Sequence, residues 1–316
     1  GMLRFFNQHS DPIEPTKIYA QTGANYSDIN ALEKDELINV IKAQVWRDPL
    51  EDISFVPTEP PDLTQDQNRI WRRIASGLED AWTGKATSPF LLHGVTGSGK
   101  TEIYLKAVKT ALAEGKRAIV LVPEISLTPQ TINRFSSRFP GKIGVVHSRL
   151  SEGERYDTWR RVREGEIQVI IGPRSALFLP IENLGLIVID ECHHESYDQQ
   201  ESQPYYRGVS TAVACARLSG AGIILGSATP RLTQYCQAVN GLWTYLDLPK
   251  RILAHQETIL HFAQRLGINL PMRVGEGKTA DLSLPAVSVV DMRQELSAGN
   301  RSIFSCELQD AIESVL

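Results

Sequence analysis

The chain has 316 residues, of which 42% are hydrophobic and 22% are charged. These proportions are typical of a globular protein with one large domain or two ordinary ones, and they exclude disordered and fibrous proteins. The formal net charge is −4. The chain as a whole is therefore not expected to bind polyanions, although a local basic groove is compatible with this charge.

The cysteines and the apolar runs define the expected compartment. Four cysteines are scattered without a C-x-x-C pair, so neither a zinc site nor a disulfide framework is expected, which fits a reducing environment. No apolar run reaches the length of about 18 residues that a membrane helix needs. The start of the chain has no signal-peptide pattern. We therefore expect a cytoplasmic protein with no membrane association.

The first part of the chain is polar and interrupted by prolines. Residues 1–60 contain one predicted helical run, over residues 31–46. After it, Pro57, Pro60 and Pro61 predict a stiff linker, because proline fixes its own φ angle and restricts the residue before it.

From residue 63 onward, short apolar runs alternate with stretches of helical periodicity. Buried strands are predicted at residues 90–93, 118–122, 143–146, 169–171, 186–189 and 223–225. Helices are predicted between them at residues 101–113, 126–138, 151–163 and 208–219. Continuous apolar strands separated by helices predict an α/β fold, in which a parallel sheet is covered by helices on both faces.

The alternation stops after residue 249. The pattern beyond it predicts a helix over residues 254–266, a loop over residues 275–280 and a strand over residues 286–290. A last helical run covers residues 306–316 and has no helix-stop signal after it.

A glycine-rich loop follows the first predicted strand, which ends at His93. The sequence there fits G-x-x-x-x-G-K-[ST], whose glycines let backbone N–H groups surround a phosphate at the start of a helix. Lys100 is expected to reach the β- and γ-phosphates and the Thr101 hydroxyl to bind Mg²⁺, whereas an ordinary glycine-rich turn is the alternative. The candidate ATP-binding residues of the loop are Gly94, Val95, Thr96, Gly97, Ser98, Gly99, Lys100 and Thr101.

An acidic pair follows the predicted strand at residues 186–189. A nucleotide-dependent phosphohydrolase needs one carboxylate near Mg²⁺ and a second that positions the attacking water. Asp190 and Glu191 suit these roles in that order. We therefore expect Lys100, Asp190 and Glu191 to be catalytic, and Thr101 and Asp190 to hold the metal. A solvated turn is the alternative for an acidic pair taken by itself.

The acidic pair is also part of a wider resemblance. Asp-Glu-Cys-His at residues 190–193 resembles the D-E-x-H signature of superfamily-two helicases. Four other stretches narrow the match: Pro-Glu-Ile-Ser-Leu-Thr-Pro-Gln at 123–130, Gly-Pro-Arg-Ser-Ala-Leu-Phe at 172–178, Gly-Ser-Ala-Thr-Pro at 226–230 and Gly-Asn-Arg-Ser-Ile-Phe at 299–304. With these motifs the chain resembles the PriA family of primosomal replication-restart helicases, over residues 45–250 and 284–316.

The resemblance implies a motor of two RecA-like lobes that unwinds DNA in the 3′→5′ direction with ATP and Mg²⁺. It divides the chain into a partial winged helix and linker (1–60), a RecA-like ATP-binding lobe (61–249) and a region that leads to a second lobe absent from this chain (250–316). The expected partners are single-stranded or forked DNA and replication-restart proteins. We expect a monomer in the bacterial cytoplasm, without zinc in this chain.

The resemblance also implies roles for single residues on either side of the loop. Gln67 is placed like a glutamine that contacts adenine, but Thr64-x-x-Gln67 also fits a helix capping box. The two roles compete for the same side chain. His193, Ser227 and Thr229 are expected to couple the acidic pair to the DNA-side loops, whereas a Ser/Thr turn that caps the next helix is the alternative for the last two.

DNA contacts are expected on two groups of residues. The first group grips phosphates after strand ends without reading sequence, and consists of Pro123, Ser126, Thr128, Arg174 and Ser175. The second group lies in a polar loop at residues 195–207 and would stack on single-stranded bases, and consists of Tyr197, Tyr205 and Tyr206. Local packing of these rings is the alternative.

Two positions depart from the family pattern. Cys192 stands where the family has a second glutamate, which lowers the local negative charge by one. Pro173 replaces the usual threonine before Arg174 and removes a backbone donor and a hydroxyl. Weaker DNA binding is the expected consequence of the second change.

Three functional hypotheses remain at this point. The first is one lobe of an ATP-dependent DNA helicase of the PriA type. The second is a translocating subunit of a restriction or remodelling complex, which the motifs at residues 123–130 and 299–304 argue against. The third is a non-catalytic module that binds ATP and DNA. The intact Lys100, Asp190 and Glu191 argue against this third hypothesis, and a missing second lobe argues for it.

Overall fold

The computed structural model describes residues 5–6, 13, 15–40, 46–47, 60–201, 203–252, 281–282 and 288–314. The chain divides into two compact units, Gly1–Trp46 and Arg47–Leu316, and each is treated by itself below. The predicted boundaries at residues 60 and 250 stay predictions. Among the described residues, no helix has both the length and the apolar character that a membrane span requires.

The described residues of the first unit include the short helices α2 (Pro15–Thr22) and α3 (Tyr26–Lys34). Ile18 of α2 and Ile29 of α3 are buried. Asn25 caps α3, because its side chain accepts hydrogen bonds from the backbone N–H groups of Ser27 and Asp28. The Asp28 carboxylate in turn accepts from the backbone N–H of Asn25 at 2.9 Å, which completes a capping box.

Helix α2 was not predicted, and α3 begins before the helical run predicted over residues 31–46. The predicted run continues past residue 34, but residues 35–40 are not helical, and residues 41–45 lie outside the described part of the chain. The backbone reverses at Glu36, which has a φ of +58°. The N–H of Leu37 then donates to the carbonyl oxygen of Leu32 at 3.0 Å. Glycine is the residue that usually adopts this left-handed conformation at the end of a helix. Here Glu36 adopts it, so the sequence carries no glycine that would mark the end.

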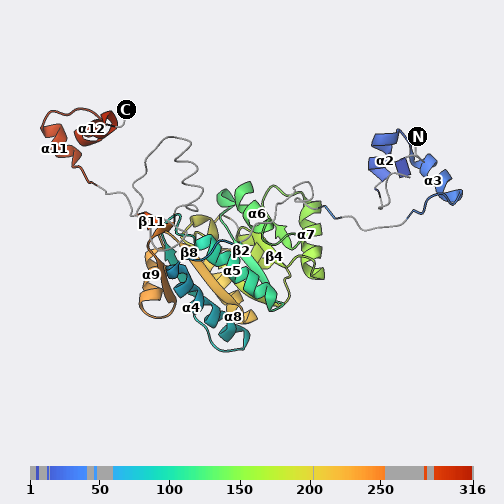
Figure 1. Ribbon diagram of the computed structural model, residues 1–316, viewed down its shortest axis with the longest axis horizontal. Coiled ribbons are helices and arrows are strands. Elements are labelled where there is room, and N and C mark those ends of the chain that lie inside the picture. The colour runs from blue at the N-terminus through green and yellow to red at the C-terminus, as the bar shows by residue number, and fades with distance from the viewer. Residues whose placement is uncertain are drawn as a thin grey trace. The chain divides into compact units, whose positions relative to one another are not determined.

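The second unit is built on a seven-stranded sheet (Figure 1). All of its neighbouring strands pair in parallel. In spatial order the strands are β3 (Ile143–Val145), β4 (Val169–Gly172), β2 (Arg117–Leu121), β5 (Leu184–Ile189), β8 (Gly222–Ser227), β1 (Phe90–Gly94) and β9 (Thr244–Leu248). The predicted α/β fold with a parallel sheet is confirmed.

Helices cover both faces of this sheet, as predicted. One face packs against α4 (Gln65–Trp82), α5 (Lys100–Ala113) and α6 (Pro129–Ser136). The other face packs against α7 (Glu152–Glu164), α8 (Gly208–Ser219) and α9 (Leu232–Val239). Successive strand residues alternate between the two cores, since Phe90 and Leu92 contribute to the first and Leu91 to the second. The strands are therefore apolar on both sides, which is why their sequences are continuous apolar runs.

Shorter elements connect the strands to the helices. They are the 3₁₀ helices η1 (Glu124–Ser126), η2 (Arg174–Phe178) and η3 (Glu195–Tyr197), and the strand pairs β6 (Asp198–Gln199) with β7 (Tyr206–Arg207) and β10 (Arg251–Ile252) with β11 (Asp281–Leu282). Near the end of the chain lie α11 (Met292–Ser297) and α12 (Cys306–Glu313).

Three sequence predictions for this unit need correction. The helix predicted over 126–138 is divided into η1 and α6, because Thr128 caps a new helix that begins at Pro129. Strand β9 was not predicted. Its sequence is Thr-Tyr-Leu-Asp-Leu, and its last three residues are buried, exposed and buried in turn. Residues 288–290 form no strand. The helix and loop predicted at 254–266 and 275–280 lie outside the described residues.

Candidate active site

The phosphate loop begins where β1 ends and finishes where α5 begins, as the sequence predicts. Gly97 and Gly99 both have a φ of +81°, a conformation that favours glycine. At Gly94 a Cβ atom would lie 2.9 Å from the Cβ of Leu248, so a side chain there would push β9 away. The loop is therefore shaped by glycines at the positions where the motif requires them.

The side chain of Lys100 binds back to the first residue of its own loop in this structure. Its side chain is buried, and its Nζ donates to the carbonyl oxygen of Gly94 at 2.7 Å. The hydroxyl of Ser98 is also buried and has no hydrogen-bond partner among the described residues. An unpartnered buried hydroxyl is costly, and its position in the loop leaves a donor available to a phosphate.

The side chain of Gln67 is hydrogen-bonded to the phosphate loop and is not available to contact adenine. Its side-chain oxygen accepts from the backbone N–H of Thr64 at 2.9 Å, and its nitrogen donates to the carbonyl oxygens of Ser98 at 3.3 Å and Gly99 at 3.4 Å. The side chain is 2% exposed. The expected adenine contact is therefore wrong for this conformation, because the capping box occupies the oxygen of the amide and the loop carbonyls occupy its nitrogen.

Asp190 lies at the end of β5, beside the phosphate loop. Its carboxylate accepts a hydrogen bond from the Tyr104 hydroxyl at 3.1 Å, and its backbone carbonyl accepts one from the Tyr197 hydroxyl at 2.6 Å. Burial, and then the charge of Glu191, raises the pKa of the Asp190 carboxyl above its usual value. A cation placed next to it would favour its charged form.

The donor groups near Asp190 fit a magnesium ion. Thr101 and Asp190 line the same cavity of about 200 Å³, which Tyr104 and Arg134 also border. A hydroxyl and a carboxylate are hard oxygen ligands of the kind that Mg²⁺ prefers. Glu191 follows with a φ of +47°, a backbone conformation that costs a non-glycine residue about 1–3 kcal/mol and that is common at functional sites.

The expected coupling residues meet at the ends of β5 and β8. The Nδ1 of His193 lies 2.8 Å from the Oγ of Ser227 and 3.4 Å from the Oε2 of Glu191. The same Ser227 oxygen accepts from the backbone N–H of Thr229 at 2.9 Å. Thr229 thus contributes its backbone to this group, and Ser227 contributes its hydroxyl. The three residues form a continuous polar contact that reaches Glu191.

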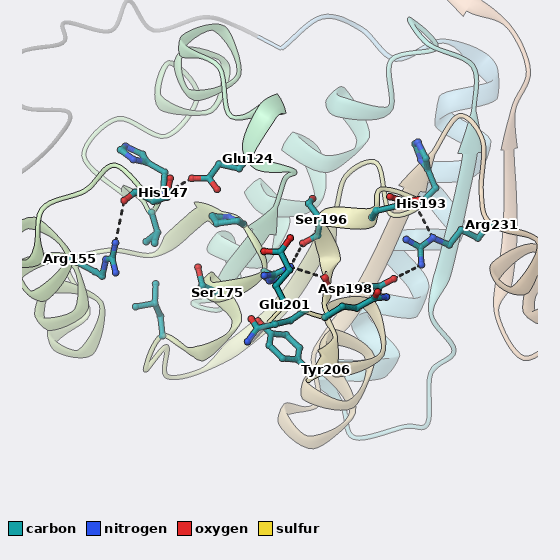
Figure 2. Close-up of a pocket in the computed structure, with 18 of the residues that line it drawn as sticks. Glu124, His147, Arg155, Ser175, His193, Ser196, Asp198, Glu201, Tyr206 and Arg231 are labelled. Atoms are coloured by element: carbon teal, nitrogen blue, oxygen red, sulfur yellow. Dashed lines mark hydrogen bonds and ion pairs between the residues drawn. The ribbon is translucent and has the colours of Figure 1, made fainter. Parts of the chain in front are cut away.

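A second and larger cavity, of about 1260 Å³, lies on the DNA side expected from the sequence (Figure 2). Arg174, Ser175, His193, Tyr206 and Thr229 line it together. Pro123, Ser126 and Thr128 are not among its lining residues. They lie instead in η1 and its flanks, where Ser126 accepts from the Thr131 hydroxyl and Thr128 caps α6.

The other wall of this cavity carries a carboxylate and a histidine. Glu124 accepts from the backbone N–H of Ser148 at 2.7 Å, and hydrogen bonding to Ser148 lowers the pKa of this carboxyl. Burial lowers the pKa of His147, whose Nδ1 is buried without a partner among the described residues. Arg155 donates to the carbonyl oxygens of Ser148 at 3.4 Å and Leu150 at 3.5 Å.

Two arginines hold the loop of residues 195–207 against the lobe. Arg174 donates to the carbonyl oxygens of Ser196 at 2.8 Å and Asp198 at 2.9 Å. Arg231 donates to the carbonyl oxygen of His193 at 2.8 Å and forms an ion pair with the Asp198 carboxylate at 2.7 Å. Figure 2 shows this pair beside the cavity. Arg174 is therefore engaged within the protein, and Arg231 and Asp198 were missed by the sequence analysis.

The three candidate tyrosines differ in exposure. Tyr197 is 1% exposed, so the expectation that it stacks on bases is wrong, because its ring is part of the core and its hydroxyl binds Asp190. Tyr206 is half-buried and packs edge-on against Phe178, with the ring centroids 5.4 Å apart. Tyr205 is 66% exposed. Of the three, Tyr205 offers the open aromatic face that stacking needs.

Comparison with known proteins identifies the class. Residues 64–237, more than half of the chain, match the family described as DEAD/DEAH box helicase. The chain belongs to this family. The match includes the phosphate loop, the Asp190–His193 motif and the Ser227–Thr229 turn.

Similarity to curated proteins narrows the class, and the predicted resemblance to PriA is confirmed. The chain is 41% identical over 304 residues to the replication restart protein PriA of Bacillus subtilis (strain 168), which is 96% of this chain and 34% of that protein. It is 38% identical over 300 residues to PriA of Chlamydia pneumoniae, which is 94% of this chain and 38% of that protein. The chain thus spans about a third of the length of these relatives.

Among solved structures, the chain is similar to RecG bound to a three-way DNA junction. The sequence identity is 23% and the TM-score is 0.44. The similarity covers 60% of this chain and 24% of that one.

Cysteine reactivity tests the burial of the acidic motif. Burial, and then the charges of Glu191 and Asp190, raises the pKa of Cys192 to about 12. The thiol is therefore neutral, and reacts slowly, from pH 7 to pH 9. We expect a thiol reagent to label the exposed Cys236 in the native protein and to label Cys192 only after unfolding, as mass spectrometry of the labelled peptides would show. Native labelling of Cys192 at the rate of Cys236 would contradict this structure.

The Arg231–Asp198 ion pair is expected to stabilise the loop. A double-mutant cycle with Arg231→Ala and Asp198→Ala should give a coupling energy of about 0.5–3 kcal/mol in chemical unfolding, because the Asp198 side chain is only 15% exposed. The more exposed Lys85–Asp80 pair is the matched control and should give a clearly smaller coupling, because solvent screens it. Equal, small couplings for both pairs would show that the contact does not hold the loop.

Proposed function

We propose that this chain is the ATP-binding lobe of an ATP-dependent 3′→5′ DNA helicase of the PriA type, which couples Mg-ATP hydrolysis to movement along single-stranded DNA. The observation that carries the proposal is the meeting of Thr101 and Asp190 on one cavity beside the phosphate loop. Thr101 lies in the first turn of α5, after the loop that follows β1, and Asp190 directly follows β5, far away in the sequence. Their convergence on the carboxyl edge of the sheet is what a nucleotide site in an open α/β fold requires.

Each residue of this site has a separate proposed role. The backbone of the phosphate loop and Lys100 bind the phosphates, and Thr101 and Asp190 hold Mg²⁺, with Asp190 acting directly or through water. The ion would neutralise negative charge on the β- and γ-phosphates. Glu191 would position the attacking water. Its carboxylate lies 3.4 Å from the Nδ1 of His193, which lines the larger cavity.

DNA is proposed to bind on the face that holds the larger cavity. Tyr205 would stack on a base, and Ser175 and Thr229 would meet the phosphate backbone. Arg174 and Arg231 already donate to protein oxygens, so they would act on DNA through the position of the 195–207 loop. His193, Ser227 and Thr229 would carry a change in that loop to Glu191.

The role of the whole protein follows from its relatives. They are named replication restart proteins, and we propose the same process for this chain, with forked DNA and other restart proteins as partners in the bacterial cytoplasm. A non-catalytic ATP- and DNA-binding module is the second candidate. It differs from the first candidate in that it would bind Mg-ATP and DNA without hydrolysing the nucleotide.

A nucleotide-binding and turnover experiment tests the proposed ATP site. We expect the purified chain to bind Mg-ATP in calorimetry, and Lys100→Ala to lose most of the affinity because Lys100 is the loop cation. Glu191→Gln, which keeps the shape of the side chain, should bind as the wild type does. Hydrolysis by the chain should stay near background, because an arginine finger contributes about 10³–10⁵ in rate.

Two results would contradict these expectations. Failure of the wild-type chain to bind Mg-ATP would overturn the proposed function. Strong DNA-stimulated hydrolysis by the chain as a purified monomer would show that this lobe needs no partner lobe for turnover.

A second prediction concerns DNA. Tyr205→Ala should weaken binding to single-stranded oligonucleotides about tenfold, because stacking on one base contributes about 1–3 kcal/mol. The effect should not depend on base sequence, and Mg-ATP affinity should not change. Tyr26→Ala, which removes another exposed tyrosine (71% exposed) from the other unit, is the control. Fluorescence anisotropy would measure both, and unchanged binding by Tyr205→Ala would exclude the stacking role.

A further inference from the structure

An arginine from outside the loop motif lies against the phosphate loop. Strand β9 pairs with β1 as far as Gly94 and Leu248, and the N–H of Val95 donates to the carbonyl oxygen of Leu248 at 3.3 Å. The chain therefore leaves β9 next to the first residues of the loop. Three residues further on, at the start of β10, Arg251 turns back onto it.

The contact is specific to the middle of the loop. The Nε of Arg251 donates to the carbonyl oxygen of Thr96 at 3.0 Å. A Cβ atom on Gly97 would lie 3.1 Å from the Cγ of Arg251 and 3.4 Å from its Nε. The arginine stem thus packs closely over Gly97, where a Cβ atom would make a tight contact. Among the described residues, the two terminal amino groups of Arg251 donate no hydrogen bond and face no carboxylate within ion-pair distance.

We propose that Arg251 binds the terminal phosphates of the nucleoside triphosphate held by this loop, an inference that rests on the proposed function. The bond from Nε to Thr96 fixes the guanidinium beside the backbone that surrounds the phosphates. Among the described residues it leaves the two terminal amino groups without a partner, and their forked geometry fits phosphate oxygens. The cation comes from the same lobe as the loop, so it acts without a second lobe.

The neighbouring Lys250 carries the same charge as Arg251 but has a different position. Lys250 lies 3.9 Å from the Asp66 carboxylate, on the side of the loop where α4 begins. Arg251 is the member of this basic pair that contacts the loop backbone. A contact to the terminal phosphate predicts discrimination between nucleotides, because ADP lacks the γ-phosphate. The affinity for ATP should therefore depend on Arg251 more than the affinity for ADP does.

Calorimetry with Mg-ATP and Mg-ADP tests this inference on the 316-residue chain. Arg251→Ala should weaken Mg-ATP binding about tenfold, the usual effect of losing one hydrogen bond to a charged group. Mg-ADP binding should fall clearly less. Arg251→Lys should recover part of the loss, since it restores the charge without the fork. Arg217→Ala, which removes an exposed arginine on α8, is the matched control and should bind both nucleotides as the wild type does.

The outcomes are distinguishable. Unchanged or tighter Mg-ATP binding by Arg251→Ala would overturn the inference and leave the proposed function intact. An equal loss for Mg-ATP and Mg-ADP would also overturn it, because that result indicates a distorted loop. If the wild-type chain binds neither nucleotide, the inference and the proposed function both fail.

Discussion

The Asp190 carboxyl group is the part of the structure on which the other features depend. It is placed at the end of a strand that is buried on both sides, where burial and the charge of Glu191 both disfavour ionisation. The Tyr104 hydroxyl of α5 donates to its side chain, and the Tyr197 hydroxyl of the 195–207 loop donates to its backbone carbonyl. A carboxylate so placed is held ready for a cation, and the adjacent Thr101 supplies a further oxygen on the same cavity.

The same position explains how two distant surfaces are connected. From Asp190, the Tyr197 hydroxyl leads into the 195–207 loop. The loop is fastened by Arg231 through Asp198 and through the carbonyl of His193, and His193 contacts Ser227 and Glu191. Few groups separate the loop from the acidic pair. A movement of the loop that broke the Arg231 contacts would therefore displace His193, which is the physical basis we propose for coupling.

The fold and the phosphate loop were predictable from the sequence because their signals are local. Apolar runs of three to five residues, separated by helical stretches, have few structural solutions other than a covered parallel sheet. The glycines of the loop meet a backbone requirement that the structure shows directly at Gly97 and Gly99. The end of α3 at Glu36 lacked such a signal, since a non-glycine residue took the left-handed conformation.

The contacts of single polar residues were less predictable, because tertiary packing decides them. Gln67 and Tyr197 both turned inward, the first to the loop carbonyls and the second to the backbone of Asp190. Arg251 contacts Thr96 only because β9 lies next to β1, and β9 was not recognised. Arg231 follows a recognised motif, yet its partner Asp198 lies 33 positions away in the chain. No spacing rule relates such residues.

The most direct test of the central claim is a crystal structure of the chain with Mg²⁺ and a non-hydrolysable ATP analogue. We predict that the analogue's phosphates lie in the loop of residues 94–101. We predict also that one metal ion is bound by the Thr101 hydroxyl, with Asp190 in its coordination shell directly or through water. A nucleotide bound elsewhere, or a metal ion whose shell excludes Asp190, would contradict the account.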